Sequence, residues 1–156
     1  YASYAAPLSL LADPQIRDDG WKVTAMYAET VLLNAGLTFL TKEIAKRTRT
    51  YVYNNDAPLN KKQEKDARSS FFSGHTSTTA SNSFFVAKVY ADFNPNSKWK
   101  PLVWSSAAAV PLATGILRIT AGKHFLTDVL VGYAVGAAVG ILVPHLHRID
   151  LGQRNP

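Results

Sequence analysis

The amino-acid sequence predicts an all-α fold, a compact bundle of about five to six helices with one long loop near the middle of the chain. Two observations indicate this class. Apolar residues recur at helical spacing in four long stretches, and no stretch alternates between polar and apolar residues as a half-buried strand would. The length of 156 residues suits one domain with a single core, so we expect no second domain.

Composition divides the chain into three parts. We expect an N-terminal arm over residues 1–20, a helical domain over residues 21–148 and a C-terminal tail over residues 149–156. Two prolines and a glycine interrupt the arm, which predicts an irregular segment with about one helical turn. Residues 50–70 lack helical spacing and mix charges of both signs, which indicates a solvated loop or, alternatively, a lid over a site.

Four long helices should form the bundle, over residues 21–47, 76–91 and 99–119 and from about residue 124 onward. The last carries glycines at every fourth position, Gly132, Gly136 and Gly140, and this spacing lets two helices approach closely. The first has a broad apolar face, typical of a core helix. That face contains Val23, Tyr27, Val31, Leu32, Ala35, Phe39 and Leu40.

None of the apolar stretches qualifies cleanly as a membrane span, for which about 20 apolar residues are needed. Residues 21–40 contain Glu29 and Asn34, and residues 103–117 are short. Residues 129–143 provide only about 15 positions before a proline and a histidine. Because mean hydropathy is also near zero, we expect a globular bundle, able to rest on a membrane, in preference to an integral membrane protein.

Charge and cysteine content exclude some chemistries. Seventeen Lys and Arg against eleven Asp and Glu give a formal net charge of +6, which favours polyanions, anionic lipid surfaces or phosphorylated substrates without choosing among them. The absence of cysteine excludes disulfides, a thiolate nucleophile and thiolate metal sites. The acidic residues form no paired cluster, and His145 and His147 have no evident third ligand, so we expect no metal site.

A cation, a histidine and a carboxylate stand in an otherwise apolar run near residue 120. Gly122 is expected to break the helix between Arg118 and His124, leaving His124 in the first turn of the next helix. His124 and Asp128 would then lie one turn apart on the same face, where the carboxylate can fix the tautomer of the imidazole. A core histidine paired with a structural aspartate is an equally good interpretation of these residues alone.

Two further motifs carry charge or oxyanion-binding chemistry. Lys42 and Arg49 are seven residues apart, so they should project from the same side of the first helix, either as a solvated face or as a phosphate clamp. Ser73, Gly74 and His75 stand where the loop meets the second helix. The exposed N–H groups of such a turn can cradle an oxyanion, and a plain helix cap is the alternative.

In this order and spacing the three motifs resemble those of the type 2 phosphatidic acid phosphatase superfamily, which also includes bacterial acid phosphatases and vanadium-dependent haloperoxidases. The resemblance extends roughly from Val23 to Leu146. It implies a helical bundle in which the motifs meet around one phosphate beside the long loop, with no cofactor. It implies the following roles: Lys42, Arg49 and Arg118 bind phosphoryl oxygens, Ser73 and Gly74 add hydrogen bonds, His75 is the general acid, and Asp128 orients His124, the nucleophile that forms a phosphohistidine.

The chain departs from the family pattern at three positions. Thr50 and Phe72 replace prolines that usually follow the second cation and precede the Ser-Gly-His motif, which affects backbone stiffness more than chemistry. Leu117 replaces a serine that usually precedes the third cation. The loss of its hydroxyl removes one hydrogen bond, worth about 1 kcal/mol.

The leading hypothesis is a metal-independent phosphatase that hydrolyses a phosphomonoester of a lipid or of a small molecule. Two alternatives remain: a haloperoxidase that holds vanadate in the same site, and a non-catalytic basic module that binds anionic lipid or nucleic acid. Under the leading hypothesis the partners are the phosphorylated substrate and a membrane surface, with no nucleic acid. The resemblance also implies a periplasmic or outer-facing, membrane-associated location, and the sequence does not indicate an oligomeric state.

Overall fold

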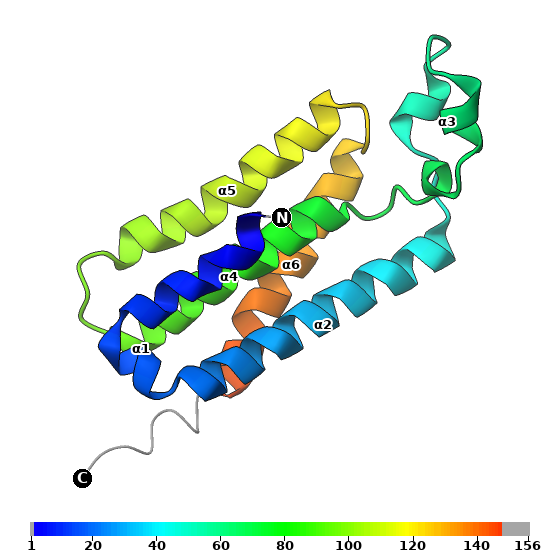
Figure 1. Ribbon diagram of the computed structural model, residues 1–156. Coiled ribbons are helices and arrows are strands. Elements are labelled where there is room, and N and C mark those ends of the chain that lie inside the picture. Colours follow the sequence, from blue (N-terminus) through cyan, green and yellow to red (C-terminus); the bar gives the residue numbers. More distant parts are fainter. Residues whose placement is uncertain (1, 148–156) are drawn as a thin grey trace.

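Four long helices form the body of the computed structural model, which describes residues 2–147 (Figure 1). They are α2 (Gly20–Ala45), α4 (Gly74–Phe93), α5 (Lys100–Thr120) and α6 (Leu126–Leu146). The described part of the chain contains six α-helices and no strand, so the all-α prediction is confirmed. The predicted tail over residues 149–156 lies outside the described residues, as does residue 148.

The N-terminal segment is more regular than predicted. The 3₁₀-helix η1 (Ala2–Ala12) is followed by the short helix α1 (Pro14–Asp18), which Asp13 caps by accepting a hydrogen bond from the Gln15 N–H. Figure 1 shows η1 lying along α4. Leu10 and Ile16 are buried against α4 and α6, so this segment contributes to the core.

The helix α4 lies at the centre of the bundle, and α6 packs against it most closely. A Cβ built on Gly132 would lie 2.6 Å from the carbonyl oxygen of Ser73, and one built on Gly136 would overlap the carbonyl oxygen of Ser77. Gly140 faces the next serine along α4 in the same way. The predicted close approach along the glycine row is therefore confirmed, and its closest contacts are to backbone.

Apolar side chains near the start of α2 and polar side chains near its middle form the contact with α4. The buried stripe of α2 consists of Val23, Met26, Thr30 and Asn34. The hydroxyl of Ser77 donates to the Asn34 side-chain oxygen across 2.5 Å. The predicted core face of α2 is confirmed at Val23 and Tyr27, which lie in or against the core. Its later part is wrong, because the large apolar side chains there are exposed on the outside of the bundle: Leu32, Leu33, Leu37, Phe39, Leu40 and Ile44.

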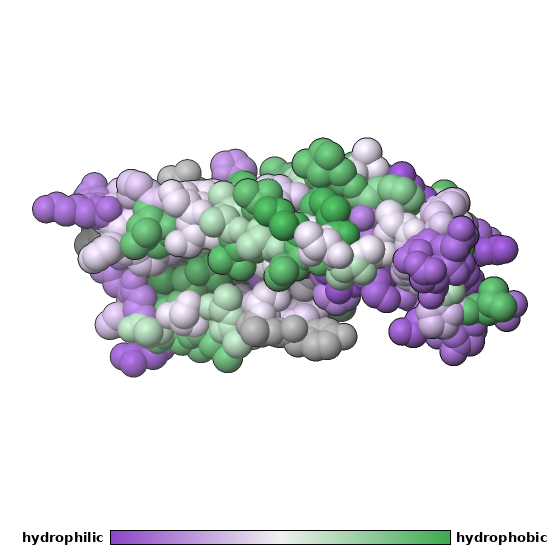
Figure 2. Space-filling view, turned by 90° about the horizontal axis from the view of Figure 1, so that it is seen from above, coloured by the Kyte–Doolittle hydropathy of each residue, from purple (hydrophilic) through white to green (hydrophobic). Residues whose placement is uncertain are grey.

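The apolar exterior of the bundle also corrects the expectation that no stretch qualifies cleanly as a membrane span. Three stretches are long and apolar enough to cross a membrane by length and composition: Gly20–Tyr53, which contains α2, together with α5 and α6. Both α5 and α6 have 21 residues, longer than the apolar runs counted in the sequence, and Asn34 faces α4 inside the bundle. Figure 2 shows apolar surface along the middle of the molecule and hydrophilic surface at both ends. These features favour membrane association.

Two left-handed residues set the connections that form the site. Gly122 has a φ of 63° just after α5, so the predicted break between Arg118 and His124 is confirmed. Lys46 has a φ of 42° and ends α2, with its N–H donating to the Lys42 carbonyl. Arg49 therefore follows the helix in extended backbone, and the prediction that it shares a helix face with Lys42 is wrong.

Residues 50–70 form three short helices where the sequence predicted an irregular loop. They are η2 (Thr50–Tyr53), α3 (Leu59–Gln63) and η3 (Lys65–Arg68). This projecting segment extends past one end of the bundle (Figure 1). The Tyr51 N–H and the Thr50 hydroxyl both donate to the Gly122 carbonyl, at 3.0 and 2.5 Å, which ties its first turn to the α5–α6 connection.

The glycine row predicts a steep local sensitivity. Replacing Gly136 by Ala should lower the free energy of unfolding by about 1–3 kcal/mol, because the added methyl must push α6 away from the Ser77 carbonyl. Chemical unfolding in detergent micelles measures this change. The matched control is Ala138→Val, at an exposed position of the same helix, which should change stability by at most about 0.5 kcal/mol. Equal effects of the two substitutions would contradict the packing described for this row.

Candidate active site

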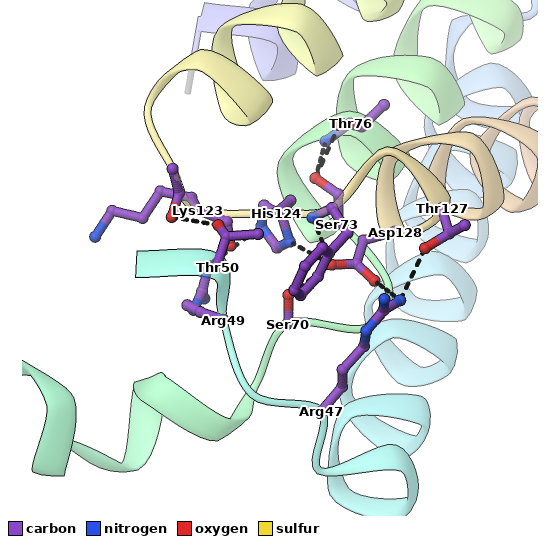
Figure 3. Close-up of polar contacts among 12 residues, drawn as sticks. Arg47, Arg49, Thr50, Ser70, Ser73, Thr76, Lys123, His124, Thr127 and Asp128 are labelled. Carbon is purple, nitrogen blue, oxygen red and sulfur yellow. Dashed lines mark hydrogen bonds and ion pairs between the residues drawn. The ribbon is translucent and has the colours of Figure 1, made fainter. Parts of the chain in front are cut away.

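Three connections meet at one end of the bundle and hold the predicted motifs together. They are the chain after α2, the N-terminus of α4 and the turn between α5 and α6. Figure 3 shows His124 on one side of the Asp128 carboxylate and Arg47 on the other. Residues far apart in sequence thus share one buried polar cluster.

The carboxylate of Asp128 is fully buried and accepts three hydrogen bonds. Arg47 Nη1 donates to Oδ1 at 2.7 Å, and the Ser70 hydroxyl donates to Oδ2 at 2.5 Å. The N–H of Phe125 also donates to Oδ2, at 3.0 Å, across the first turn of α6. Because the Ser73 N–H donates to the Asp128 carbonyl at 2.9 Å, the same residue also fixes the start of α4.

His124 lies just before α6, so its predicted place inside the first helical turn is wrong. Its Nδ1 is 3.7 Å from Asp128 Oδ2 and makes no hydrogen bond. Its Nε2 is 3.2 Å from Arg49 Nη1. A guanidinium can only donate, so Nε2 presents its lone pair and the proton of the neutral ring belongs on Nδ1, the side facing the carboxylate.

Burial lowers the pKa of His124 to about 4, and the positive charges of Arg49 and Arg118 act in the same direction. Asp128 opposes them by favouring the imidazolium. The imidazole is therefore neutral at pH 7, the state in which a ring nitrogen can act as nucleophile or base.

Arg49 is buried and already engaged by protein acceptors. Its Nε donates to the Asp66 carbonyl at 2.8 Å and its Nη2 to the Asp66 carboxylate at 2.7 Å. Its Nη1 donates to the Lys123 carbonyl at 3.3 Å in addition to facing His124. An oxyanion beside His124 would take the place of the imidazole as the acceptor for Nη1, while Asp66 keeps the guanidinium oriented.

Three buried polar atoms in the described part of the chain lack a hydrogen-bond partner: Thr38 Oγ1, Arg118 Nε and His124 Nδ1. A Cβ added to Gly74 would lie 3.1 Å from the Thr38 methyl and 3.5 Å from Lys42 Nζ, which places Thr38 and Lys42 at the start of α4. Buried groups without partners are rare in folded proteins. His124 Nδ1 faces the Asp128 carboxylate, whereas Thr38 Oγ1 and Arg118 Nε can serve a polar ligand.

His75 lies on the exposed side of the first turn of α4. It lines a hollow of about 350 Å³, the α2–α4 hollow, whose other walls include Lys42, Gly74 and Phe39. Burial lowers the pKa of His75, and the charges of Arg118 and Lys42 lower it further. A bound anion would oppose those charges and raise this pKa, which is the direction a general acid requires.

The Ser73 hydroxyl caps α4 in this structure, as the alternative interpretation held. It accepts from the Thr76 N–H at 3.4 Å and lies 2.9 Å from the Thr76 hydroxyl. Its backbone N–H is bound to Asp128. A direct contact from Ser73 to a ligand stays a prediction.

Sequence reasoning missed Arg47, Ser70, Asp66 and Thr38. The first three lie outside the long helices, so no helical spacing connects them to the motifs. Arg47 could have been noticed as a second arginine two residues before Arg49. Its partner is 81 positions away, and only the tertiary fold brings the two together.

Residues 23–150 match the family model described as the PAP2 superfamily. Phospholipid phosphatase 1 of Rattus norvegicus is 32% identical over 97 residues, which are 60% of this chain and 34% of that protein. Phosphatidylglycerophosphatase B of Bacillus subtilis (strain 168) is 29% identical over 128 residues, which are 72% of this chain and 63% of that protein. The chain thus spans less than two thirds of the length of these two curated relatives.

A solved structure has a similar arrangement of helices. It is the crystal structure of a transmembrane PAP2 type phosphatidylglycerolphosphate phosphatase from Bacillus subtilis, with a TM-score of 0.67 and 26% sequence identity. The match covers 99% of this chain and 70% of that chain. The helical fold of that structure is therefore also the fold of this chain.

The Arg47–Asp128 pair should matter for stability. Replacing Arg47 by Ala leaves a buried carboxylate short of one donor, and because Arg47 is partly exposed we expect a loss of about 1–3 kcal/mol in the free energy of unfolding. The control is Lys65→Ala, which breaks an exposed pair with Glu43 and should cost at most about 1 kcal/mol. In Arg47→Ala/Asp128→Asn the two losses should not add. Strict additivity would contradict the contact.

The protonation state of His124 can be measured directly. In ¹⁵N-labelled protein without phosphate, NMR of its ring nitrogens should show titration near pH 4 and the proton on Nδ1 at neutral pH. Arg49→Gln removes a nearby positive charge and should raise this midpoint, whereas Arg17→Gln on α1 should leave it unchanged. A wild-type midpoint near 6.5 would contradict the burial and charge described here.

Proposed function

The chain belongs to the PAP2 superfamily, and from this premise we propose that it is a metal-independent phosphatase that removes the terminal phosphate of a membrane lipid. The names of its relatives, a phospholipid phosphatase and a phosphatidylglycerophosphatase, support the class of substrate. One observation of the site carries the reaction type: a buried neutral imidazole presents its Nε2 lone pair beside a guanidinium that can hold a phosphoryl oxygen.

In the proposed first step, Nε2 of His124 attacks phosphorus and the bond to the leaving oxygen breaks. His75 gives its proton to that oxygen, so the lipid alcohol leaves and a phosphohistidine remains. In the second step His75 takes a proton from water, the water oxygen attacks phosphorus, and the P–N bond breaks to release phosphate and the neutral His124. The carboxylate of Asp128, 3.7 Å from Nδ1, stabilises the positive charge that the imidazole gains.

In this proposal, cationic side chains supply most of the stabilisation of the transition state. Lys42, Arg49 and Arg118 neutralise the phosphoryl oxygens as charge spreads over them in the transition state. Gly74 and the neighbouring N–H groups at the start of α4 add the positive end of the helix dipole, with Ser73 as the cap. Because the Arg49 guanidinium is already paired with the Asp66 carboxylate, it is oriented before the substrate binds.

A lipid substrate also fits the surroundings of the site. The site lies at one end of the three stretches that are apolar enough to cross a membrane, so phosphate would reach it at the membrane surface. The α2–α4 hollow begins at His75 and includes the exposed ring of Phe39, which offers apolar contact to an acyl chain or glycerol. We further propose that residues 21–148 form the catalytic unit and that the site faces the periplasm or cell exterior.

The first test of this proposal is phosphate release in EDTA. We expect turnover of a lipid phosphomonoester in detergent micelles, with a higher kcat/KM than for a soluble phosphomonoester, and inhibition by vanadate, which mimics the transition state on His124. Activity that needed added magnesium would overturn the metal-independent mechanism. Halide oxidation with vanadate and no phosphate release would instead establish the haloperoxidase alternative.

The two histidines can be separated by leaving group. His124→Ala should lose activity on all substrates and should give no trapped phosphohistidine. In His75→Ala, kcat should fall about 10²–10⁴-fold for an alkyl phosphate. It should fall much less for p-nitrophenyl phosphate, whose leaving group needs little protonation. Arg118→Ala should lower kcat by about 10²–10³ on both. A trapped phosphoenzyme in His124→Ala that His75→Ala lacks would reverse the two assignments.

A further inference from the structure

A second hollow, distinct from the α2–α4 hollow, lies between the end of α2 and the projecting segment. It has a volume of about 510 Å³, and we call it the basic hollow. Figure 2 shows hydrophilic surface at this end of the molecule, as at the opposite end. Its walls are Lys42, Glu43, Lys46, Lys62, Gln63, Glu64, Lys65, Arg68 and Ser69.

Positive charge in the basic hollow exceeds what its carboxylates neutralise. Five cations face two carboxylates, and one of these, Glu43, is paired with Lys65 at 3.5 Å. In the part of the chain that the structure describes, Lys62 and Arg68 have no ion pair. Cations held around one concavity repel one another and raise the local concentration of anions.

The backbone at Lys46 supports a role for its side chain. The residue that ends a helix in the left-handed conformation is usually glycine, and a side chain there costs about 1 kcal/mol. The chain has a lysine at this position, with a φ of 42°, and that lysine lines the basic hollow.

The basic hollow adjoins the proposed active site through two elements. Lys42 lines both hollows. The helix η3 contributes to both places, because its Asp66 holds Arg49 while its Lys65 and Arg68 line the basic hollow. An anion in the basic hollow would therefore share Lys42 with the proposed active site.

We propose that the basic hollow is a second oxyanion site, which binds a phosphoryl group other than the one that is hydrolysed. Its volume exceeds that of one phosphate, so it has room for the group that the phosphate is attached to. The phosphoryl group can belong to the same substrate, to the headgroup of a neighbouring anionic lipid or to free phosphate. Its relation to catalysis depends on the proposed function, but its existence does not.

Binding of inorganic phosphate tests the site independently of turnover. Calorimetry on the full chain in detergent at low salt should give two phosphates per chain. The variant Lys62→Gln/Arg68→Gln should bind one, and Arg118→Ala, which disables the proposed active site, should bind one in the basic hollow. The matched control Lys61→Gln, next to Lys62 on α3 but outside the lining, should bind two.

Phosphate binding that is the same in Lys62→Gln/Arg68→Gln as in the wild type, or an equal loss in Lys61→Gln and in Lys62→Gln/Arg68→Gln, would overturn the proposal. Two bound phosphates in a protein that hydrolyses no phosphomonoester would disprove the proposed function and leave the second site standing.

Turnover by Lys62→Gln, set against Lys61→Gln, identifies the source of the anion. If the anion belongs to the substrate, kcat/KM falls about 10-fold for a doubly phosphorylated compound and stays unchanged for a singly phosphorylated one. If it belongs to a neighbouring lipid, the fall appears only in phosphatidylcholine vesicles that contain phosphatidylglycerol. If it is free phosphate, both rates stay unchanged and product inhibition weakens about 10-fold. Identical behaviour of the two variants in all three assays would overturn the proposal.

Discussion

The buried carboxylate of Asp128 is the group on which the rest of the site depends. A charge removed from water costs several kcal/mol unless donors replace the lost hydration, and here the donors are Arg47, Ser70 and the Phe125 N–H. They come from three separate stretches of chain. The end of α2, the approach to α4 and the start of α6 must therefore all be in place before this charge is satisfied, and the position of His124 follows from theirs.

Fold class and helix positions could be predicted from the sequence, because each long helix has its own periodicity and its own breaking residues. The predicted break at Gly122 and the close packing of the glycine row were correct for this local reason. The buried residues in the middle of α2 could not be predicted. Ordinary reasoning assigns apolar residues to the interior, whereas α2 buries Thr30 and Asn34 and exposes leucines. An apolar exterior of this kind is stable in lipid, where polar groups must find partners within the protein.

The three motifs lie close together at one end of the bundle, but their contacts could not be predicted from the sequence. Arg49 was expected on a helix face, yet the left-handed backbone at Lys46 redirects the chain, and Arg49 contacts Asp66 and His124. The backbone conformation of Lys46 depends on how α2 meets the projecting segment, and no local sequence pattern predicts that contact. The same is true of Arg47, whose contact spans most of the domain. The sequence can show which residues carry chemistry, while tertiary structure determines which of them touch.

The glycine row fixes the position of one part of the site, whereas the projecting segment is a more variable part. Along it, α6 lies against the backbone of α4, and the Ser73 N–H donates to the Asp128 carbonyl, so backbone contacts hold Ser73 and Asp128 together. The projecting segment is joined to that unit by polar contacts and short turns, and it contributes few buried residues of its own. Insertions and substitutions within residues 54–64, away from the residues that hold Arg49, Gly122 and Asp128, can therefore accumulate without moving His124. A surface segment of this kind can vary among related chains while the groups around His124 keep their positions.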